Sequence, residues 1–135
     1  MTQTIPDMSD TIAAAISGWP GPAQARFTEL RQTVFETASR LPETGGLTET
    51  LKWGEPSYAP VKSRTGTAIR ITWKSKSPDS ISLFVNCQTS LIETWRDQFP
   101  ALIYVGNREI RLSLDGPMPD EISSCIAHAL TYRLR

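Results

Sequence analysis

The sequence predicts an α+β domain, built on a mostly antiparallel sheet with N- and C-terminal helices packed on one face. Three observations predict it. Hydrophobic residues at helical spacing come first, alternating hydrophobic and polar residues follow, and helical spacing returns toward the C-terminus. Mostly short turns join these segments, which favours antiparallel neighbours. The chain has 135 residues, a length that fits one compact domain.

Two helices are predicted before residue 46. In the first, SDTIAAAIS, Ser9 caps the N-terminus and Gly18 ends the helix. The second helix begins near Pro22, because proline suits the first helical turn. Its hydrophobic residues recur three or four positions apart, which places them on one side of the helix. That stripe consists of Phe27, Leu30, Val34, Ala38 and Leu41.

The period changes to two after this helix, which indicates strands. Residues 47–53 alternate imperfectly, because Glu49 falls on the apolar side. A short strand is predicted around residues 59–62. Pro60 favours a sheet edge or a loop there, since proline has no N–H for a ladder hydrogen bond.

The next two strands are better defined. Residues 68–74 and 80–86 both alternate between hydrophobic and polar side chains. Between them, Ser77, Pro78 and Asp79 are typical turn residues. The two segments are therefore predicted to form an antiparallel hairpin.

Helical spacing returns in residues 89–99, where Thr89 or Ser90 is the expected cap and Pro100 ends the helix. Gly106-Asn107 then marks a hairpin turn between strands at 102–105 and 109–114. The last predicted helix opens at Pro119 and buries Ile122, Cys125, Ile126, Ala129 and Leu130.

Charge is unevenly distributed along the chain. The formal net charge is zero, but residues 52–111 hold nine Lys and Arg against five Asp and Glu. This excess is far below that of a typical nucleic-acid-binding protein, so no nucleic-acid partner is expected. A mildly basic region does suit a small anion.

The cysteines and the N-terminal residues indicate the cellular compartment in which the protein is expected. Cys87 and Cys125 lack CxxC or Cys/His spacing, which argues against a zinc site. Residues 1–10 show neither the basic start nor the apolar run of a signal peptide. No segment approaches the roughly 20 apolar residues that a membrane span needs. A soluble, cytoplasmic protein with reduced thiols and no membrane partner is expected.

Five strings of the sequence stand together in order: LKWGEPSY, GTAIRITWK, SLFVNCQTSLIETWR, GNREIRLSL and CIAHALTY. Together they resemble the YdhG-like domain family, a bacterial family of unknown function, over residues 47–132. Residues 1–46 resemble the family only in being helical. The whole chain, residues 1–135, is expected to form a single YdhG-like domain. The resemblance implies an α+β fold and no established enzymatic activity. Some relatives have been linked, by similarity of fold, to frataxin-like iron chaperones.

The stretch LKWGEPSYAP has two interpretations. Gly54 and Pro56 turn the chain, so Trp53 and Tyr58 can close one end of the core. Alternatively, the two aromatic residues form one wall of a pocket, with Lys52 and Glu55 as polar groups. The sequence favours the packing interpretation, because buried aromatic residues pack more often than they bind.

A basic sheet face is the second candidate feature. If the alternation holds, Lys52, Arg70, Lys74 and Arg111 project away from the helices, and no acidic residue shares their face. Unpaired like charges repel one another, so a bound anion would relieve them. The hypothesis is a small anionic ligand that stacks on Phe84, Trp53 or Tyr58. The alternative is a solvated polar face.

We therefore predict a binding or accessory module with a small-ligand pocket at one end of the sheet. The alternative is a frataxin-like iron or metal carrier, since Glu29 and Glu36 lie on about the same side of the second helix. Arg26, Arg31 and Arg40 interrupt that acidic side. The predicted ligand-binding residues are Lys52, Trp53, Glu55, Tyr58, Lys62, Arg70, Trp73 and Asn86.

No catalytic constellation is recognisable. Cys87 lies between a predicted strand and a predicted helix. A nucleophilic cysteine normally needs a histidine as its base. His128 lies three residues after Cys125 on the last helix, and nothing in the sequence brings it to Cys87. Cys87 is therefore expected to be a small buried packing residue. No catalytic residue, cofactor or resident metal is expected. The chain is expected to be a monomer, or a weak dimer if residues 47–53 form an unpaired edge strand.

Overall fold

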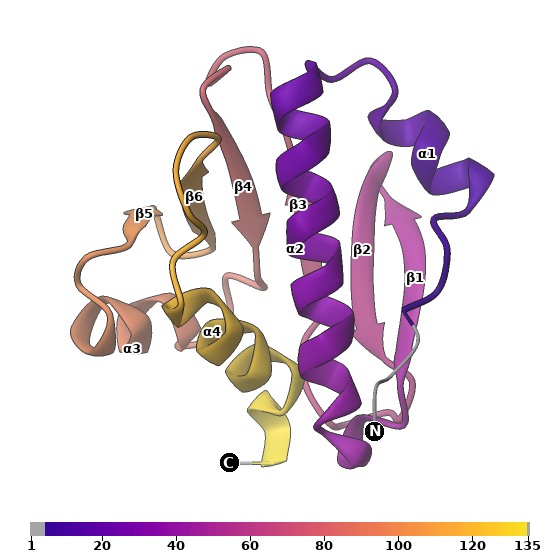
Figure 1. The fold of residues 1–135 in the computed structure, drawn as a ribbon. Helices are drawn as coiled ribbons and strands as arrows, with labels where there is room; N and C mark the ends of the chain where they lie inside the picture. Colours follow the sequence, from indigo (N-terminus) through magenta and orange to yellow (C-terminus); the bar gives the residue numbers. More distant parts are fainter. Residues whose placement is uncertain (1–4, 135) are drawn as a thin grey trace.

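A computed structural model describes residues 5–134. Residues 1–4 and 135, which the single-domain prediction includes, lie outside the described residues. One antiparallel sheet of six strands forms the centre of the fold (Figure 1). The strands are β1 (Leu47–Lys52), β2 (Glu55–Pro60), β3 (Ile69–Thr72), β4 (Ser80–Phe84), β5 (Ile103–Val105) and β6 (Glu109–Ser113).

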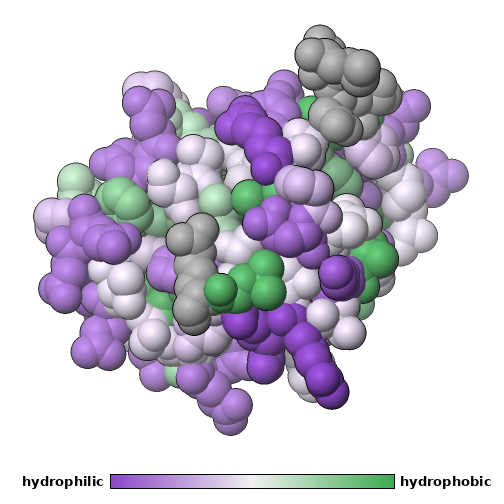
Figure 2. Space-filling model, turned by 90° about the horizontal axis from the view of Figure 1, so that it is seen from below, coloured by the Kyte–Doolittle hydropathy of each residue, from purple (hydrophilic) through white to green (hydrophobic). Residues whose placement is uncertain are grey.

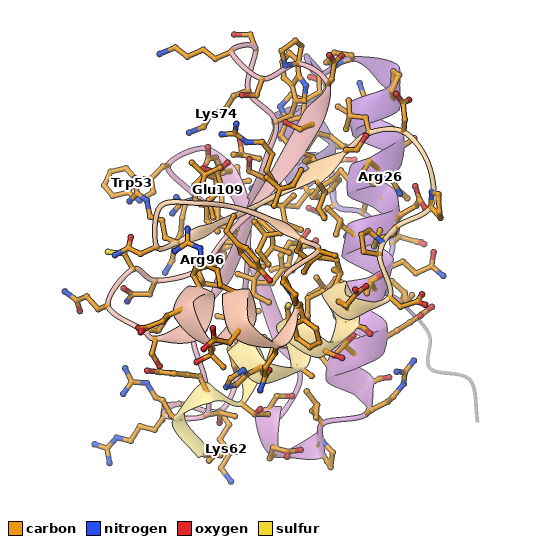
Figure 3. The ribbon with its side chains drawn as sticks, turned by 90° about the vertical axis from the view of Figure 1, so that its left-hand side faces the viewer. Arg26, Trp53, Lys62, Lys74, Arg96 and Glu109 are labelled. Atoms are coloured by element: carbon orange, nitrogen blue, oxygen red, sulfur yellow. The ribbon has the colours of Figure 1, made fainter. Side chains whose placement is uncertain are left out.

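The strand order in space is β1-β2-β3-β4-β6-β5. Helix α2 crosses one face of this sheet, and α4 lies beside it on the same face (Figure 1). Viewed from the side, no helix formed by residues 5–134 covers the opposite face of the sheet (Figure 3). The predicted α+β fold is therefore confirmed. The helices are α1 (Asp10–Ile16), α2 (Gly21–Ser39), α3 (Leu91–Gln98) and α4 (Glu121–Leu130), with short 3-10 turns η1 (Pro42–Thr44) and η2 (Tyr132–Leu134).

The N-terminal helices begin where the sequence predicts. The Ser9 side chain accepts a hydrogen bond from the Ile12 N–H at 3.2 Å, which caps α1. Pro22 lies in the first turn of α2, where its missing N–H costs no helical hydrogen bond. The α2 stripe packs against the sheet, and its members Phe27, Leu30, Val34 and Ala38 are buried.

A buried ion pair accounts for the imperfect alternation of β1. Glu49 lies on the helix-covered side of the sheet, and the guanidinium of Arg31 from α2 binds its carboxylate. The Tyr58 hydroxyl lies beside this pair without a well-aligned hydrogen bond. Burial is the main cause that raises the pKa of Tyr58 above its ordinary value. Glu49 is therefore a core residue with a partner on α2.

Strand β2 is longer than predicted and begins directly after the turn. The sequence places a short strand at 59–62, whereas β2 covers Glu55–Pro60 and pairs with β1 along its whole length. Its ladder with β3 spans only Ser57 and Tyr58. Pro56 and Pro60 lie outside that ladder, so neither has to donate a hydrogen bond to β3.

Both predicted hairpins are confirmed. β3 pairs with β4, and β5 pairs with β6 across the turn at Gly106, which has φ +63°. The inward residues of these strands meet the helices in one core. Its largest fully buried side chains include Trp95, Tyr58, Phe27, Leu30, Ile71 and Leu83.

The loop between β2 and β3 is fixed to the C-terminal end of α4. The Thr67 N–H donates to the Ala129 carbonyl at 2.9 Å, and the Arg133 N–H donates to the Thr65 carbonyl at 3.0 Å. Gly66 lies between these contacts. A Cβ atom at position 66 would lie 2.2 Å from the Leu130 carbonyl oxygen, so only glycine fits.

Within residues 5–134, no helix is both long enough and apolar enough to cross a bilayer. Seen from below, this face of the molecule carries mostly hydrophilic and intermediate residues, and its hydrophobic residues form small separate groups (Figure 2). Single exposed hydrophobic residues are ordinary on a protein surface.

Candidate functional site

A cleft of about 420 Å³ lies on the helix-free face of the sheet. One cross-strand row forms its floor, in which Ser57 pairs with Arg70 and Arg70 pairs with Phe84. Their chain neighbours Tyr58, Ile69 and Leu83 point into the core instead, as strand alternation requires. The lining residues are Lys52, Trp53, Ser57, Gly66, Thr67, Ala68, Arg70, Phe84, Val85, Asn86, Cys87 and Arg108.

Phe84, one of the three expected stacking residues, is covered by two cations. The guanidinium carbon of Arg70 lies 5.0 Å from the ring centroid, and the Lys74 Nζ lies 5.2 Å from it. These are cation–π distances. Phe84 is therefore buried although it projects from the open face, and both cations are partly engaged by its ring.

Two acidic residues share the open face, so the prediction that no acid lies there is wrong. The Glu55 carboxylate lies 2.6 Å from Arg70 Nε, in a close ion pair without a well-aligned hydrogen bond. Glu109 pairs with Arg111 at 3.2 Å and accepts a hydrogen bond from the Ser82 hydroxyl at 2.5 Å. Arg70 and Arg111 are thus already neutralised by partners on the sheet.

Lys52 and Arg108 are the cations of the cleft that lack such a partner. Neither forms an ion pair with an acidic residue in the described part of the chain. Lys52 ends β1, whereas Arg108 immediately precedes β6, so the two approach the cleft from different strands. Because the described lining includes these cations and no carboxylate, its local charge is positive.

Trp53 lies on the rim of the cleft in a two-residue hairpin turn. Lys52 pairs with Glu55, and the two residues between them have positive φ angles, +55° at Trp53 and +76° at Gly54. This is the type I′ pattern, which favours Asn-Gly. A tryptophan in this conformation costs about 1–2 kcal/mol. The prediction that Trp53 closes the core is wrong, because 89% of its surface is exposed.

The opposite wall combines polar backbone with two side chains at the end of β4. Asn86 Oδ1 accepts a hydrogen bond from the Gln88 N–H at 2.8 Å, which leaves its amide nitrogen as a donor. The Cys87 thiol is exposed, so the expectation of a buried packing residue is wrong. The anchored loop at 66–68 completes this wall.

The structure brings together half of the predicted ligand-binding residues. Lys52, Trp53, Arg70 and Asn86 line the cleft, and Glu55 holds Arg70 from beside it. The remaining three do not line this cleft. Tyr58 is fully buried, Trp73 packs against the core on the helix side, and Lys62 lies at the lower end of the molecule (Figure 3).

Several lining residues escaped the sequence prediction. Arg108 follows Gly106-Asn107 and is assigned to the hairpin turn by its position. Residues 66–68 belong to a loop without a binding motif, and only its attachment to α4 places them at the cleft. The one sequence feature that could have indicated Arg108 as a binding residue is its position as a cation directly after the turn residues Gly106-Asn107.

The remaining candidate chemistry lies elsewhere. Trp95 Nε1 donates a hydrogen bond to His128 Nδ1 at 3.1 Å, which places the histidine at the contact of α3 and α4. Burial raises the pKa of the Cys125 thiol to about 12. Among residues 5–134, no three His, Cys, Asp or Glu side chains come close enough to hold a metal ion. The metal-carrier alternative therefore gains no support from the described residues.

The search of family models, of curated proteins and of solved structures gave no match to this chain, so the resemblance to the YdhG-like family stays a prediction.

Proposed function

We propose that this protein binds a small anionic ligand in the cleft on the open face of the sheet. One observation carries the proposal: Lys52, Arg70 and Arg108 line the cleft, and no carboxylate of residues 5–134 does. The ion pairs on this face use Glu55 and Glu109, which leaves Lys52 and Arg108 for an incoming anion.

The energetics favour this use of the cleft. Two unit charges about 4 Å apart attract each other by about 4 kcal/mol near a protein surface, so two available cations stabilise an anion appreciably. The Asn86 amide and the Thr67 side chain add neutral hydrogen-bond donors to the lining. A phosphate or carboxylate group matches this set of donors.

Cys87 supplies a built-in reporter for the test. Its thiol is exposed in the cleft, whereas Cys125 is buried. An uncharged reagent such as N-ethylmaleimide should modify Cys87, and an anion bound in the cleft should slow that reaction. Ribose 5-phosphate and inorganic pyrophosphate are suitable probes, with calorimetry as the direct measure of affinity.

The variants separate a specific site from general electrostatic attraction. Lys52→Ser and Arg108→Ser should each weaken binding by about 1.5–3 kcal/mol, the contribution of a hydrogen bond to a charged group. Lys62→Ser removes the same charge at an exposed position outside the cleft, so it should leave affinity unchanged. The proposal fails if neither probe binds the wild type, or if Lys62→Ser weakens binding as much as the other two variants.

A further inference from the structure

We infer that the ligand carries a flat aromatic ring beside its anionic group, and that Trp53 selects it by stacking. The inference rests on the anion-binding function proposed above and names the class of ligand for the same cleft. A nucleoside monophosphate has this chemistry, because a planar base and a phosphate are joined by a short sugar linker.

Neither the turn nor the core requires a tryptophan at position 53. The type I′ turn favours asparagine there, because Asn adopts positive φ angles more readily than other non-glycine residues. The indole makes no hydrogen bond and no ring contact within residues 5–134. A strained backbone position that holds an exposed aromatic residue beside a cleft points to ligand contact.

Trp53 also has the ring faces that the other aromatic candidates lack. Tyr58 is fully buried on the far side of the sheet, and the Phe84 ring is covered by Arg70 and Lys74. The Trp53 indole stands clear of the sheet on the side opposite α2 (Figure 3). A flat group that enters the cleft can therefore stack on Trp53 without displacing a neighbour.

The turn also fixes the indole close to a cation. Lys52 directly precedes Trp53 and pairs in the ladder with Glu55, which is itself bound to Arg70. Both sides of the two-residue turn are thus held on the sheet. Because Lys52 and Trp53 are chain neighbours that line the same cleft, one small molecule can present its ring to Trp53 and its anionic group to Lys52.

The test compares two probes that differ only in the ring. Adenosine monophosphate and ribose 5-phosphate share the sugar and the phosphate, and only the first carries a base. Their affinities are measured by calorimetry for the wild type, for Trp53→Asn and for Trp53→Tyr. Trp53→Asn gives the preferred turn sequence Asn-Gly, so it should fold with a melting temperature at or above that of the wild type.

Wild type should bind adenosine monophosphate about tenfold more tightly than ribose 5-phosphate, the low end of what base stacking contributes. Trp53→Asn should abolish this preference without weakening ribose 5-phosphate, and Trp53→Tyr should restore most of it. The inference is overturned if both probes bind the wild type equally, or if Trp53→Asn keeps the preference. If neither probe binds, the proposed function itself fails and the inference falls with it.

Discussion

The Arg31 guanidinium and the Glu49 carboxylate form a bidentate ion pair between α2 and β1, with Nε–Oε2 and Nη2–Oε1 distances of 2.7 and 3.1 Å. Both side chains are almost fully buried, at 7% and 14% exposed. The carboxylate is the largest cause that raises the pKa of Arg31 above its ordinary value. Arg31 Nη2 also donates to the Asp7 carbonyl at 3.3 Å, so the pair connects the N-terminal segment, the long helix and the edge strand.

Removing one partner of this pair should destabilise the fold strongly. Glu49→Ala leaves the Arg31 charge buried without its counterion, and a loss of about 3 kcal/mol in the free energy of unfolding is expected. Urea unfolding measures it. Asp97→Ala removes an exposed carboxylate on α3 and should change stability by less than about 0.5 kcal/mol. A loss below about 1 kcal/mol for Glu49→Ala would show that the pair is solvated.

Gly66→Ala should destabilise the protein and disturb the cleft. The added Cβ would lie 2.2 Å from the Leu130 carbonyl oxygen, a backbone atom that cannot rotate away. The loop must shift, at a cost of about 2 kcal/mol or more. Gly18→Ala is the matched control, because apart from its chain neighbours no described residue lies within 4 Å of the position of its Cβ. Equal melting temperatures for the two variants would contradict the close approach.

Stability should decline at alkaline pH because of Cys125. Burial raises the pKa of its thiol to about 12, so the native state keeps a proton that the unfolded chain loses near pH 9. The stability that the protonated Cys125 thiol contributes is fully present below about pH 9. It is lost as the pH rises toward 12. About 1–2 kcal/mol should disappear between about pH 8 and 10.

Urea unfolding at about pH 8 and about pH 10, in the presence of a reducing agent, measures this loss of stability. Cys125→Ala removes the titrating group, so its stability should fall less over the same interval. Measurements are kept at or below about pH 10, because burial also raises the pKa of Tyr104, to about 12, and tyrosine adds its own dependence at higher pH. An equal decline in the variant and the wild type would rule out Cys125 as the cause.

The two thiols should differ in reactivity. Under native conditions N-ethylmaleimide should add once, at Cys87, because that residue is exposed and Cys125 is buried. In urea both thiols should react. Mass spectrometry counts the adducts, and Cys87→Ser should give none in the native state. Two rapid native adducts would mean that α4 opens readily.

The periodicity of the sequence predicts most of the fold. The α2 stripe, the β3–β4 hairpin and the β5–β6 hairpin follow from local patterns that tertiary contacts reinforce. Strand β2 departs from its prediction because Pro56 and Pro60 resemble loop residues. Only the limited extent of the β2–β3 ladder makes them acceptable in a strand, and that extent depends on the rest of the sheet.

The candidate site was harder to predict, for two physical reasons. Partners such as Glu55 for Arg70 and Glu109 for Arg111 become neighbours only through strand register and the turn, which charge counts along the chain do not show. The second reason is that the sequence does not show whether an aromatic residue in or next to a strand points into the core or into solvent. Tyr58 lies in the core and Trp53 in solvent, because the turn between β1 and β2 places Trp53 outside the alternation.

The attachment of residues 65–67 to Ala129 and Arg133 has a consequence for synthesis. Every residue that lines the cleft, up to Arg108, leaves the ribosome before the residues that hold its wall in place. The nascent chain can therefore pair its strands while the binding surface is still incomplete. On the ribosome, the wall formed by this loop can be fixed in place only after α4 and Arg133 have been synthesised.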